Sequence, residues 1–154
     1  MTISWEGKPN RKYFLKKLIV ENSYTTMIEV GVRDGRTTFY LLDNCPNLTI
    51  YGVDLDIRLF YNDTVKEKYG NRLVPIRGDS SCVADKCPQA DLVFIDGDHS
   101  YEGCKKDILA YNSKVKSNGV LSGHDYDFVG VNQAVNELVL KFDIGPNNVW
   151  FYKK

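Results

Sequence analysis

Two short segments of this sequence carry side chains that can exchange protons near neutral pH. They are "DGDHSYEG" (96–103) and "GHDY" (123–126), and they contain the only two histidines in the chain. A neutral imidazole accepts a proton efficiently near pH 7, because its unperturbed pKa is about 6.5. The alternative is that both histidines only hydrogen-bond the loop backbones and shape a pocket. The candidate catalytic residues are Asp96, His99, His124 and Asp125.

The same two segments are rich in carboxylates, which are suitable ligands for Mg²⁺. A cation bound there would lower the pKa of a hydroxyl group and orient it for reaction. A metal-assisted reaction and a reaction that relies on histidine alone are therefore both compatible with these residues.

Each segment follows a short apolar run that is rich in β-branched residues, and three similar runs occur earlier in the chain. The five runs are "TMIEVGV" (26–32), "LTIYGVD" (48–54), "RLVPIRGD" (72–79), "DLVFIDGD" (91–98) and "GVLSGHD" (119–125). Runs that are apolar almost throughout are typical of parallel strands covered on both faces. Pro75 cannot donate a hydrogen bond to a neighbouring strand, so we expect the third strand at a sheet edge.

Helical patterns separate the apolar runs. Ser100 is a plausible N-cap for a helix whose apolar residues reach Tyr111, and residues 131–142 repeat apolar side chains at helical spacing up to Phe142. After Gly145 and Pro146, the tail 147–154 reads as one more strand, antiparallel beside the fifth.

Alternating strands and helices predict an α/β fold. We expect a single domain over residues 1–154, with a helical segment at 1–24 and a doubly wound, Rossmann-like core at 25–154. The sheet should be mostly parallel, with a C-terminal antiparallel strand.

Composition excludes several classes of protein. The 154 residues are 43% hydrophobic, which suffices for one core, and 20 basic residues balance 20 acidic ones. The net charge is zero, so it does not favour nucleic acid or a membrane as a partner. No apolar run is long enough to span a bilayer. The polar N-terminal residues lack a signal-peptide core, so we expect a cytoplasmic protein. The four cysteines form no CxxC pair, and we expect reduced thiols.

The N-terminal segment also groups basic residues on one side of an expected helix. The simplest interpretation is a solvated face, and the alternative is a surface that receives an anionic substrate. The basic residues are Lys8, Arg11, Lys12, Lys16 and Lys17.

In a doubly wound sheet, ligands bind at the carboxyl ends of the strands. Gly31 and Gly35 bracket the first such loop, where glycine allows close approach of a ligand and a helix N-terminus offers free N–H groups. Asp54 ends the second run and could bind both hydroxyls of a ribose. Asp79 could accept a hydrogen bond from an adenine amino group. An ordinary tight turn and a helix cap explain the glycines and Asp79 equally well.

Arg33 replaces the middle glycine of a dinucleotide-binding fingerprint, and this disfavours an NAD-dependent oxidoreductase. Taken together, the strand ends instead resemble class I S-adenosylmethionine (SAM) dependent methyltransferases. The closest resemblance is to the subgroup with D-G-D-H-[ST]-Y-E-G after the fourth strand and G-H-D-Y after the fifth. It covers roughly residues 25 to 152.

The resemblance implies SAM as the cofactor. It would place the methionine part near Glu29, Gly31, Gly35, Thr37 and Thr38, the ribose on Asp54, the adenine near Asp79 and Ser80, and Asp96 near the ammonium and methyl groups. Related metal-dependent O-methyltransferases imply Asp96 and Asp125 as Mg²⁺ ligands. His124 and Tyr126 flank Asp125 where a tandem acid or Asn would be expected, so metal dependence stays open.

The implied function is methyl transfer to a hydroxyl of a small molecule or sugar. The alternatives are an N-methyltransferase and a non-catalytic SAM-binding module. Larger relatives carry additions before the first strand and after the fifth that cover the acceptor pocket, and no comparable insertions are evident here. A large acceptor, a second subunit that completes the pocket, or loss of activity would each fit such an open site.

Overall fold

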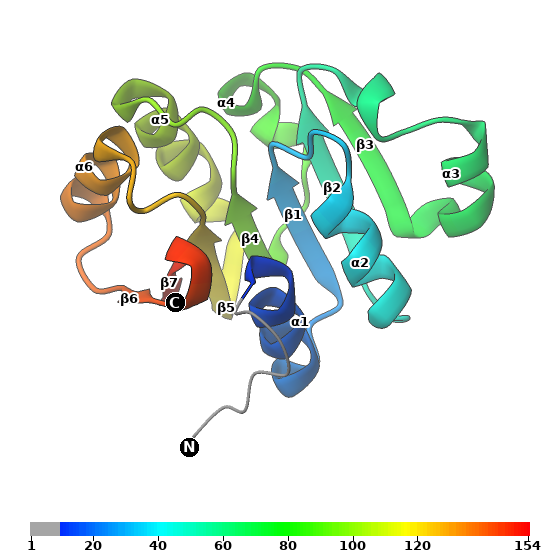
Figure 1. Cartoon of the computed structure of the whole chain (residues 1–154), viewed down its shortest axis with the longest axis horizontal. Coiled ribbons are helices and arrows are strands. Elements are labelled where there is room, and N and C mark those ends of the chain that lie inside the picture. Colours follow the sequence, from blue (N-terminus) through cyan, green and yellow to red (C-terminus); the bar gives the residue numbers. More distant parts are fainter. Residues whose placement is uncertain (1–9) are drawn as a thin grey trace.

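The computed structural model describes residues 10–154 and confirms the predicted α/β fold, with helices on both faces of one sheet (Figure 1). In this described part of the chain, seven strands lie in the order β3-β2-β1-β4-β5-β7-β6, which Figure 1 shows crossing the molecule from right to left. The strands are β1 (Thr26–Val30), β2 (Thr49–Asp54), β3 (Leu73–Arg77), β4 (Ala90–Ile95), β5 (Val115–Gly123), β6 (Asp143–Ile144) and β7 (Trp150–Lys153).

The first five strands are parallel, and the C-terminal part of the sheet is antiparallel. β7 pairs antiparallel with β5, as the tail was expected to do, and the two-residue strand β6 pairs antiparallel with β7. β6 was not predicted, because two residues are too few to give a periodic pattern. β3 lies at the other edge of the sheet, which confirms the position expected from Pro75.

Within residues 10–154, six α-helices cover the sheet. They are α1 (Arg11–Asn22), α2 (Arg36–Asn44), α3 (Asp63–Tyr69), α4 (Ser80–Val83), α5 (Tyr101–Tyr111) and α6 (Val129–Leu138). Successive side chains of a strand point to opposite faces, and the core divides accordingly. Ile28 and Val30 pack on the face covered by α4, α5 and α6, whereas Met27 packs on the face covered by α1, α2 and α3.

Two helix boundaries were predicted with different success. The hydroxyl of Ser100 accepts a hydrogen bond from the Gly103 amide at 3.1 Å and caps α5, as expected. The pattern at 131–142 was wrong at its end, because α6 stops at Leu138 and Val139 has extended backbone angles. Phe142 lies beyond the helix, but its ring packs 5.5 Å from that of Tyr126 over the same core. Apolar residues therefore continue at helical spacing beyond the end of α6, because residues on both sides of that end pack on the same core.

Within the described residues, the expected N-terminal helix is α1, which the Asn10 side chain caps and which buries Phe14, Leu15 and Ile19. Lys8 and the rest of residues 1–9 lie outside the described residues. None of the helices in residues 10–154 combines the length and apolar character that a membrane span requires.

Candidate active site

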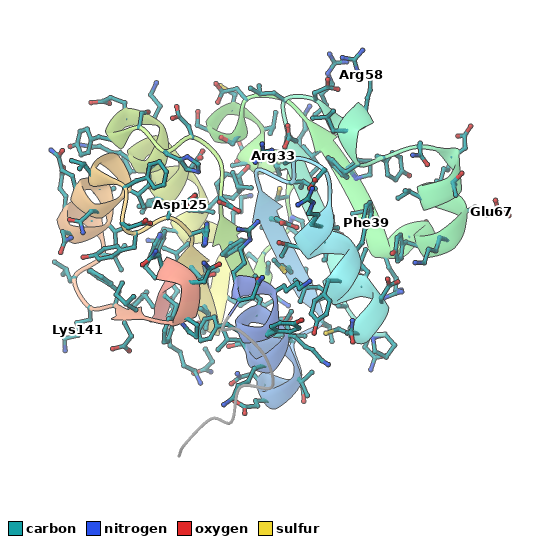
Figure 2. All side chains as sticks on the ribbon, in the orientation of Figure 1. Arg33, Phe39, Arg58, Glu67, Asp125 and Lys141 are labelled. Carbon is teal, nitrogen blue, oxygen red and sulfur yellow. The ribbon has the colours of Figure 1, made fainter. Side chains whose placement is uncertain are left out.

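A cavity of about 960 Å³ lies at the carboxyl ends of the parallel strands, the place expected for a ligand in this fold. Its wall includes residues from the loops that follow β1, β2, β3, β4 and β5. Figure 2 shows Arg33 and Asp125 between the two ends of the molecule, which are marked by Glu67 and Lys141. Ten of the residues predicted from the sequence line the cavity: Glu29, Gly31, Thr37, Asp54, Asp79, Ser80, Asp96, His99, His124 and Asp125.

The loop after β1 requires glycine at Gly31. Its φ is +85°, and a Cβ atom there would lie 2.3 Å from the carbonyl oxygen of Asp96. The loop therefore passes against the end of β4 with no room for a side chain. Gly35 has φ +78° and forms the N-cap of α2, but it is not part of the cavity wall formed by residues 10–154. Its contribution to the cavity is the turn itself.

Beneath this loop lies a buried carboxyl group. Glu29 is on β1, and the hydroxyl of Thr38 donates a hydrogen bond to it. Burial raises the pKa of Glu29 to about 8, and although the Thr38 hydroxyl lowers it, the charge of Asp96 adds to the rise. Thr38 is fully buried and is not part of the cavity wall formed by residues 10–154. Thr37 is on the wall, and its hydroxyl accepts a hydrogen bond from Arg11 Nε at 3.3 Å. Thr38 thus positions Glu29 instead of facing the cavity.

Asp54 is held rigidly where β2 ends. One carboxylate oxygen accepts a hydrogen bond from the Arg33 amide at 2.8 Å and the other from the Asp56 amide at 3.1 Å. Arg33 has φ +61°, so its backbone turns the N–H group towards Asp54 while its side chain stays exposed. Arg33, which disfavours a dinucleotide site, therefore helps to hold Asp54 in place through its backbone amide.

Asp79 and Ser80 begin α4 after β3. The carboxylate of Asp79 accepts hydrogen bonds from the Ser81 amide at 3.1 Å and the Ser81 hydroxyl at 2.7 Å. These bonds hold the pKa of Asp79 below its usual value. Asp79 is thus a helix cap as well as a wall residue, so the two interpretations offered by the sequence are not exclusive.

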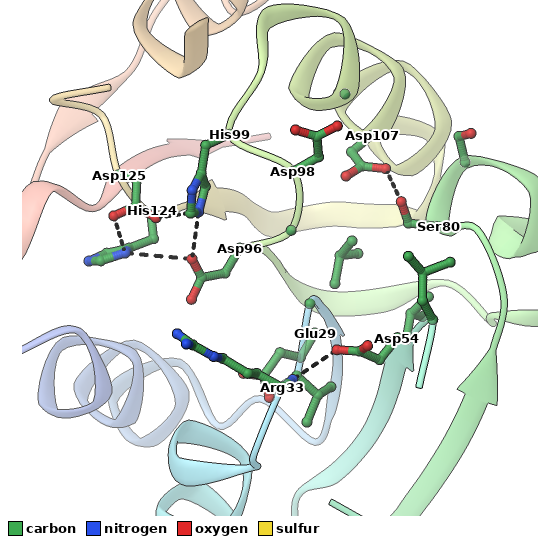
Figure 3. Close-up of a pocket in the computed structure, with 18 of the residues that line it drawn as sticks. Glu29, Arg33, Asp54, Ser80, Asp96, Asp98, His99, Asp107, His124 and Asp125 are labelled. Carbon is green, nitrogen blue, oxygen red and sulfur yellow. Dashed lines mark hydrogen bonds and ion pairs between the residues drawn. The ribbon is translucent and has the colours of Figure 1, made fainter. Parts of the chain in front are cut away.

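Asp96, His124 and Asp125 form a compact cluster at the ends of β4 and β5 (Figure 3). His124 Nδ1 lies 2.9 Å from Asp125 Oδ1 and 3.6 Å from Asp96 Oδ1. Consecutive residues of a strand point to opposite faces, but Asp125 has φ +57°. This turn of the backbone lets the side chains of His124 and Asp125 contact each other beside Asp96.

His99 completes the group from the loop after β4. Its Nε2 atom lies 2.7 Å from Asp125 Oδ2, and its ring packs 4.8 Å from that of Phe128. Phe128 is itself exposed, so an aromatic surface adjoins the cluster. The His99 side chain is 43% exposed, against 10% for His124, which makes His99 the histidine more accessible to a ligand.

The two histidines differ in electrostatic environment. Burial alone would lower the pKa of His124, but the Asp96 carboxylate 3.6 Å away and the charge of Asp125 outweigh burial and raise the pKa. The second ring nitrogen, Nε2, lies 3.2 Å from the side-chain oxygen of Asn147. Oxygen atoms next to both ring nitrogens favour the protonated ring, so less of His124 is in the neutral form that can accept a proton near neutral pH than of an unperturbed imidazole.

The cluster also has the composition of a cation site. One ligand atom from each of Asp96, His124 and Asp125 lies within 4.8 Å of the other two. Two carboxylates and an imidazole can bind Mg²⁺ together with water, and they suit Mn²⁺ equally well. The predicted pair of metal ligands therefore lies in one place, and the structure adds His124 to it.

Two of the wall residues that sequence reasoning missed contact predicted site residues. Arg11 was read only as part of a basic helix face, yet its Nε atom lies 3.8 Å from Asp96 Oδ2. Asp107 was not considered, although it occurs at the spacing of the buried face of α5, between Cys104 and Tyr111. A charged residue among buried positions was the available signal.

Comparison with protein families gives one match over most of the chain. A family model described as a methyltransferase domain matches residues 28–126, a range that includes every predicted site residue. No curated protein sequence matches the chain significantly.

Solved structures share the fold at low sequence identity. A Staphylococcus aureus protein provisionally named as a caffeoyl-CoA O-methyltransferase aligns with a TM-score of 0.79 and 14% identity, over 100% of this chain and 85% of that one. Cofactor-bound Rv0187 from MTB aligns with a TM-score of 0.73 and 15% identity, over 98% and 80%.

MycE, a methyltransferase of the mycinamycin biosynthetic pathway solved with Mg, SAH and mycinamycin VI, aligns with a TM-score of 0.70 and 16% identity. The alignment covers 92% of this chain and 48% of MycE, so the chain spans about half the length of that protein. At these identities the likenesses establish the fold alone.

Proposed function

The chain belongs to the methyltransferase domain family, and from this membership we propose that it transfers a methyl group from S-adenosylmethionine to a hydroxyl oxygen of a small molecule. The observation that carries the proposal is one cavity with two differently equipped ends. Asp54 lies at one end, His124 and Asp125 lie at the other, and the glycine loop and Asp96 lie between them (Figure 3).

We assign the first end to the cofactor. Asp54 is suited to the two ribose hydroxyls because the amides of Arg33 and Asp56 already hold its carboxylate in place. Gly31 allows the methionine part to approach the backbone where a side chain would collide with β4. Thr37 at the start of α2 is suited to the methionine carboxylate. The residues assigned to direct cofactor contact are Glu29, Gly31, Thr37, Asp54, Asp79, Ser80 and Asp96.

We assign the second end to the acceptor. In methyl transfer the acceptor oxygen forms a bond to the methyl carbon while the carbon–sulfur bond breaks and its electron pair stays on sulfur, which gives S-adenosylhomocysteine. The acceptor must also lose its proton. His99 is the candidate base, because it is exposed to the cavity and Asp125 orients its ring. His124, with its raised pKa, is better suited to holding the two carboxylates together.

The donor set of the cluster fits a divalent cation. Asp96 and Asp125 would hold the ion, as proposed from the sequence, and His124 would join them after losing its proton. Bound there, Mg²⁺ would lower the pKa of an acceptor hydroxyl. MycE was solved with Mg, SAH and mycinamycin VI, and this supports a small-molecule acceptor and a cation for the present chain at the level of the shared fold. The O-methyltransferase name of the Staphylococcus aureus protein supports a hydroxyl acceptor in the same way.

Calorimetric titration tests the proposal. The purified protein should bind S-adenosylmethionine and S-adenosylhomocysteine but not NAD, and Asp54→Ala should weaken binding by roughly tenfold or more, since hydrogen bonds to a charged group are lost. Asp56→Ala is the matched control, because the Asp56 side chain bonds Arg58 instead of facing the ribose position.

The outcomes separate three alternatives. Binding of S-adenosylmethionine followed by transfer to a panel of phenols, catechols and sugars supports the proposal. Transfer only to amines would replace it with N-methylation. Binding without transfer to any acceptor would favour a non-catalytic module, and binding of neither cofactor form would refute the proposal altogether.

A further inference from the structure

One wall residue of the cavity, Asp107, has a buried carboxylate oxygen with no hydrogen-bond partner among residues 10–154. Asp107 on α5 is 2% exposed and belongs to the lining, yet its Oδ2 atom is unpaired. A buried acceptor without a partner costs free energy, so such a group usually marks a position that a ligand or an ordered water fills.

The rest of the Asp107 carboxyl group is firmly held. The Ser80 hydroxyl donates to Oδ1 at 2.5 Å, and the hydroxyl of Tyr111 donates to the Ser80 carbonyl at 2.8 Å. These bonds tie α5 to the start of α4 and leave Oδ2 as the oxygen still able to accept. The wall beside it is close, because a Cβ atom on Gly97 would lie 3.4 Å from Oδ2.

The chemistry of this position calls for a hydrogen-bond donor. Burial raises the pKa of Asp107 to about 6, and the charges of Asp79 and Asp98 add to the rise although the Ser80 hydroxyl opposes it. The group is therefore mostly ionised above neutral pH. An ionised carboxylate only accepts hydrogen bonds, so it favours an N–H group and repels a carbonyl oxygen.

The place of Asp107 in the cavity indicates which N–H group this is. Figure 3 shows Asp107 and Ser80 at the side of the cavity opposite His124 and Asp125, with Asp54 below them. With the ribose on Asp54 and the reacting sulfonium towards Asp96, the base extends towards Ser80. We propose that Asp107 accepts a hydrogen bond from the exocyclic amino group of the cofactor's adenine and thereby selects adenine over bases that carry an oxygen there.

This inference rests on the proposed function, and it differs from the role foreseen for Asp79. The Asp79 carboxylate is exposed and already caps α4 through Ser81, whereas Asp107 is buried with one oxygen free. A desolvated acceptor discriminates more strongly than an exposed one, because an unpaired partner cannot turn to water instead.

Calorimetry with two product analogues tests the inference on the whole protein. The ligands are S-adenosylhomocysteine and S-inosylhomocysteine, in which a carbonyl oxygen replaces the amino group. Unaltered protein should bind the adenine form at least about tenfold more tightly. In Asp107→Asn, whose amide can donate to that oxygen, the preference should fall below about threefold. Asp79→Asn changes the other acid assigned to the cofactor and should keep most of the preference, and Asp85→Asn, an exposed acid that is not on the cavity wall formed by residues 10–154, is the control and should keep all of it.

The results distinguish the two proposals. Equal affinity of the unaltered protein for both analogues would overturn the role of Asp107 and leave the proposed function intact, even if Asp107→Asn failed to fold. A preference lost in Asp79→Asn and kept in Asp107→Asn would assign base selection to Asp79. If neither analogue bound, the proposed function would itself fail, and this inference with it.

Discussion

His99 Nε2 lies 2.7 Å from Asp125 Oδ2, so the more exposed histidine of the site is oriented by a carboxylate that comes from a different strand end. Breaking this pair should slow transfer without loss of the cofactor. We expect His99→Gln and Asp125→Asn each to lower kcat by about 10²- to 10⁴-fold. Asn tolerates the positive φ at residue 125, so the loop should persist.

Steady-state kinetics and calorimetry check this prediction together. Affinity for S-adenosylhomocysteine should change less than threefold in both variants, and the double variant should be no slower than the worse single one, because the two residues act as a unit. A double variant whose losses multiply would show that His99 and Asp125 act separately.

The carboxylate cluster predicts a response to divalent cations. Chelation with EDTA should lower the transfer rate, and Mg²⁺ or Mn²⁺ should restore it. Asp96→Asn should weaken the dependence by removing one charged ligand, whereas Asp98→Asn, which changes a carboxylate that bonds Ser100, should leave it in place. Rates that do not respond to EDTA would point to His99 as the sole aid to deprotonation.

The crowding of the loop after β1 predicts that one added methyl group at Gly31 strongly lowers the free energy of unfolding. Gly31→Ala should destabilise the fold by about 3 kcal/mol or more, since both the positive φ and the 2.3 Å approach to Asp96 oppose a Cβ atom. Gly70→Ala is the control: its φ is +54°, but nothing lies within 4 Å of the added atom.

Urea denaturation measures the two glycine variants side by side. Gly70→Ala should lose only about 1 to 3 kcal/mol, and it should retain cofactor affinity. Equal losses for both variants would mean that backbone conformation alone, and not contact with β4, fixes glycine at position 31.

The buried acid beneath the cofactor site predicts a pH dependence of stability. The pKa of Glu29 is about 8 in the folded protein and its ordinary value is 4.5, so between these pH values the folded state holds a proton that the unfolded chain has released. Stability should therefore fall as pH rises through this window, by up to about 1.4 kcal/mol per pH unit from this group.

Glu29→Gln isolates the effect, because a neutral amide does not titrate. The variant should gain stability relative to the unaltered protein as pH rises from about 5 to 7.5, measured as the difference in free energy of unfolding at each pH. Glu67→Gln changes an exposed glutamate on α3 and serves as the control. A constant difference between Glu29→Gln and the unaltered protein would contradict the raised pKa.

The sequence was informative wherever a pattern has a local cause. Apolar runs with polar ends predicted the five parallel strands, and Pro75 predicted the edge because a missing N–H group acts within its own strand. Asp96, His99, His124 and Asp125 were grouped correctly because parallel strands bring their carboxyl ends to one side of the sheet. Ser100 was recognised because a cap lies next to the helix it begins.

Features that depend on distant contacts could not be foreseen in this way. Thr38 turns away from the cavity because Glu29, nine residues earlier, binds its hydroxyl. The contact between Arg11 and Asp96 joins residues far apart in the chain. Asp107 pairs with Ser80 through one oxygen only when α4 and α5 pack together, a tertiary event that no short window of sequence contains.

The antiparallel entry of β7 has a consequence for engineering. The turn that precedes it, Pro146–Asn148, reaches the same side of the sheet as the ends of the parallel strands, and there Asn147 meets His124. This turn belongs to none of the loops that flank the glycine turn or Asp54. A longer loop grafted between Gly145 and Val149 should therefore cover the acceptor end of the cavity and change which acceptors fit, while Asp54 and the glycine loop stay unchanged.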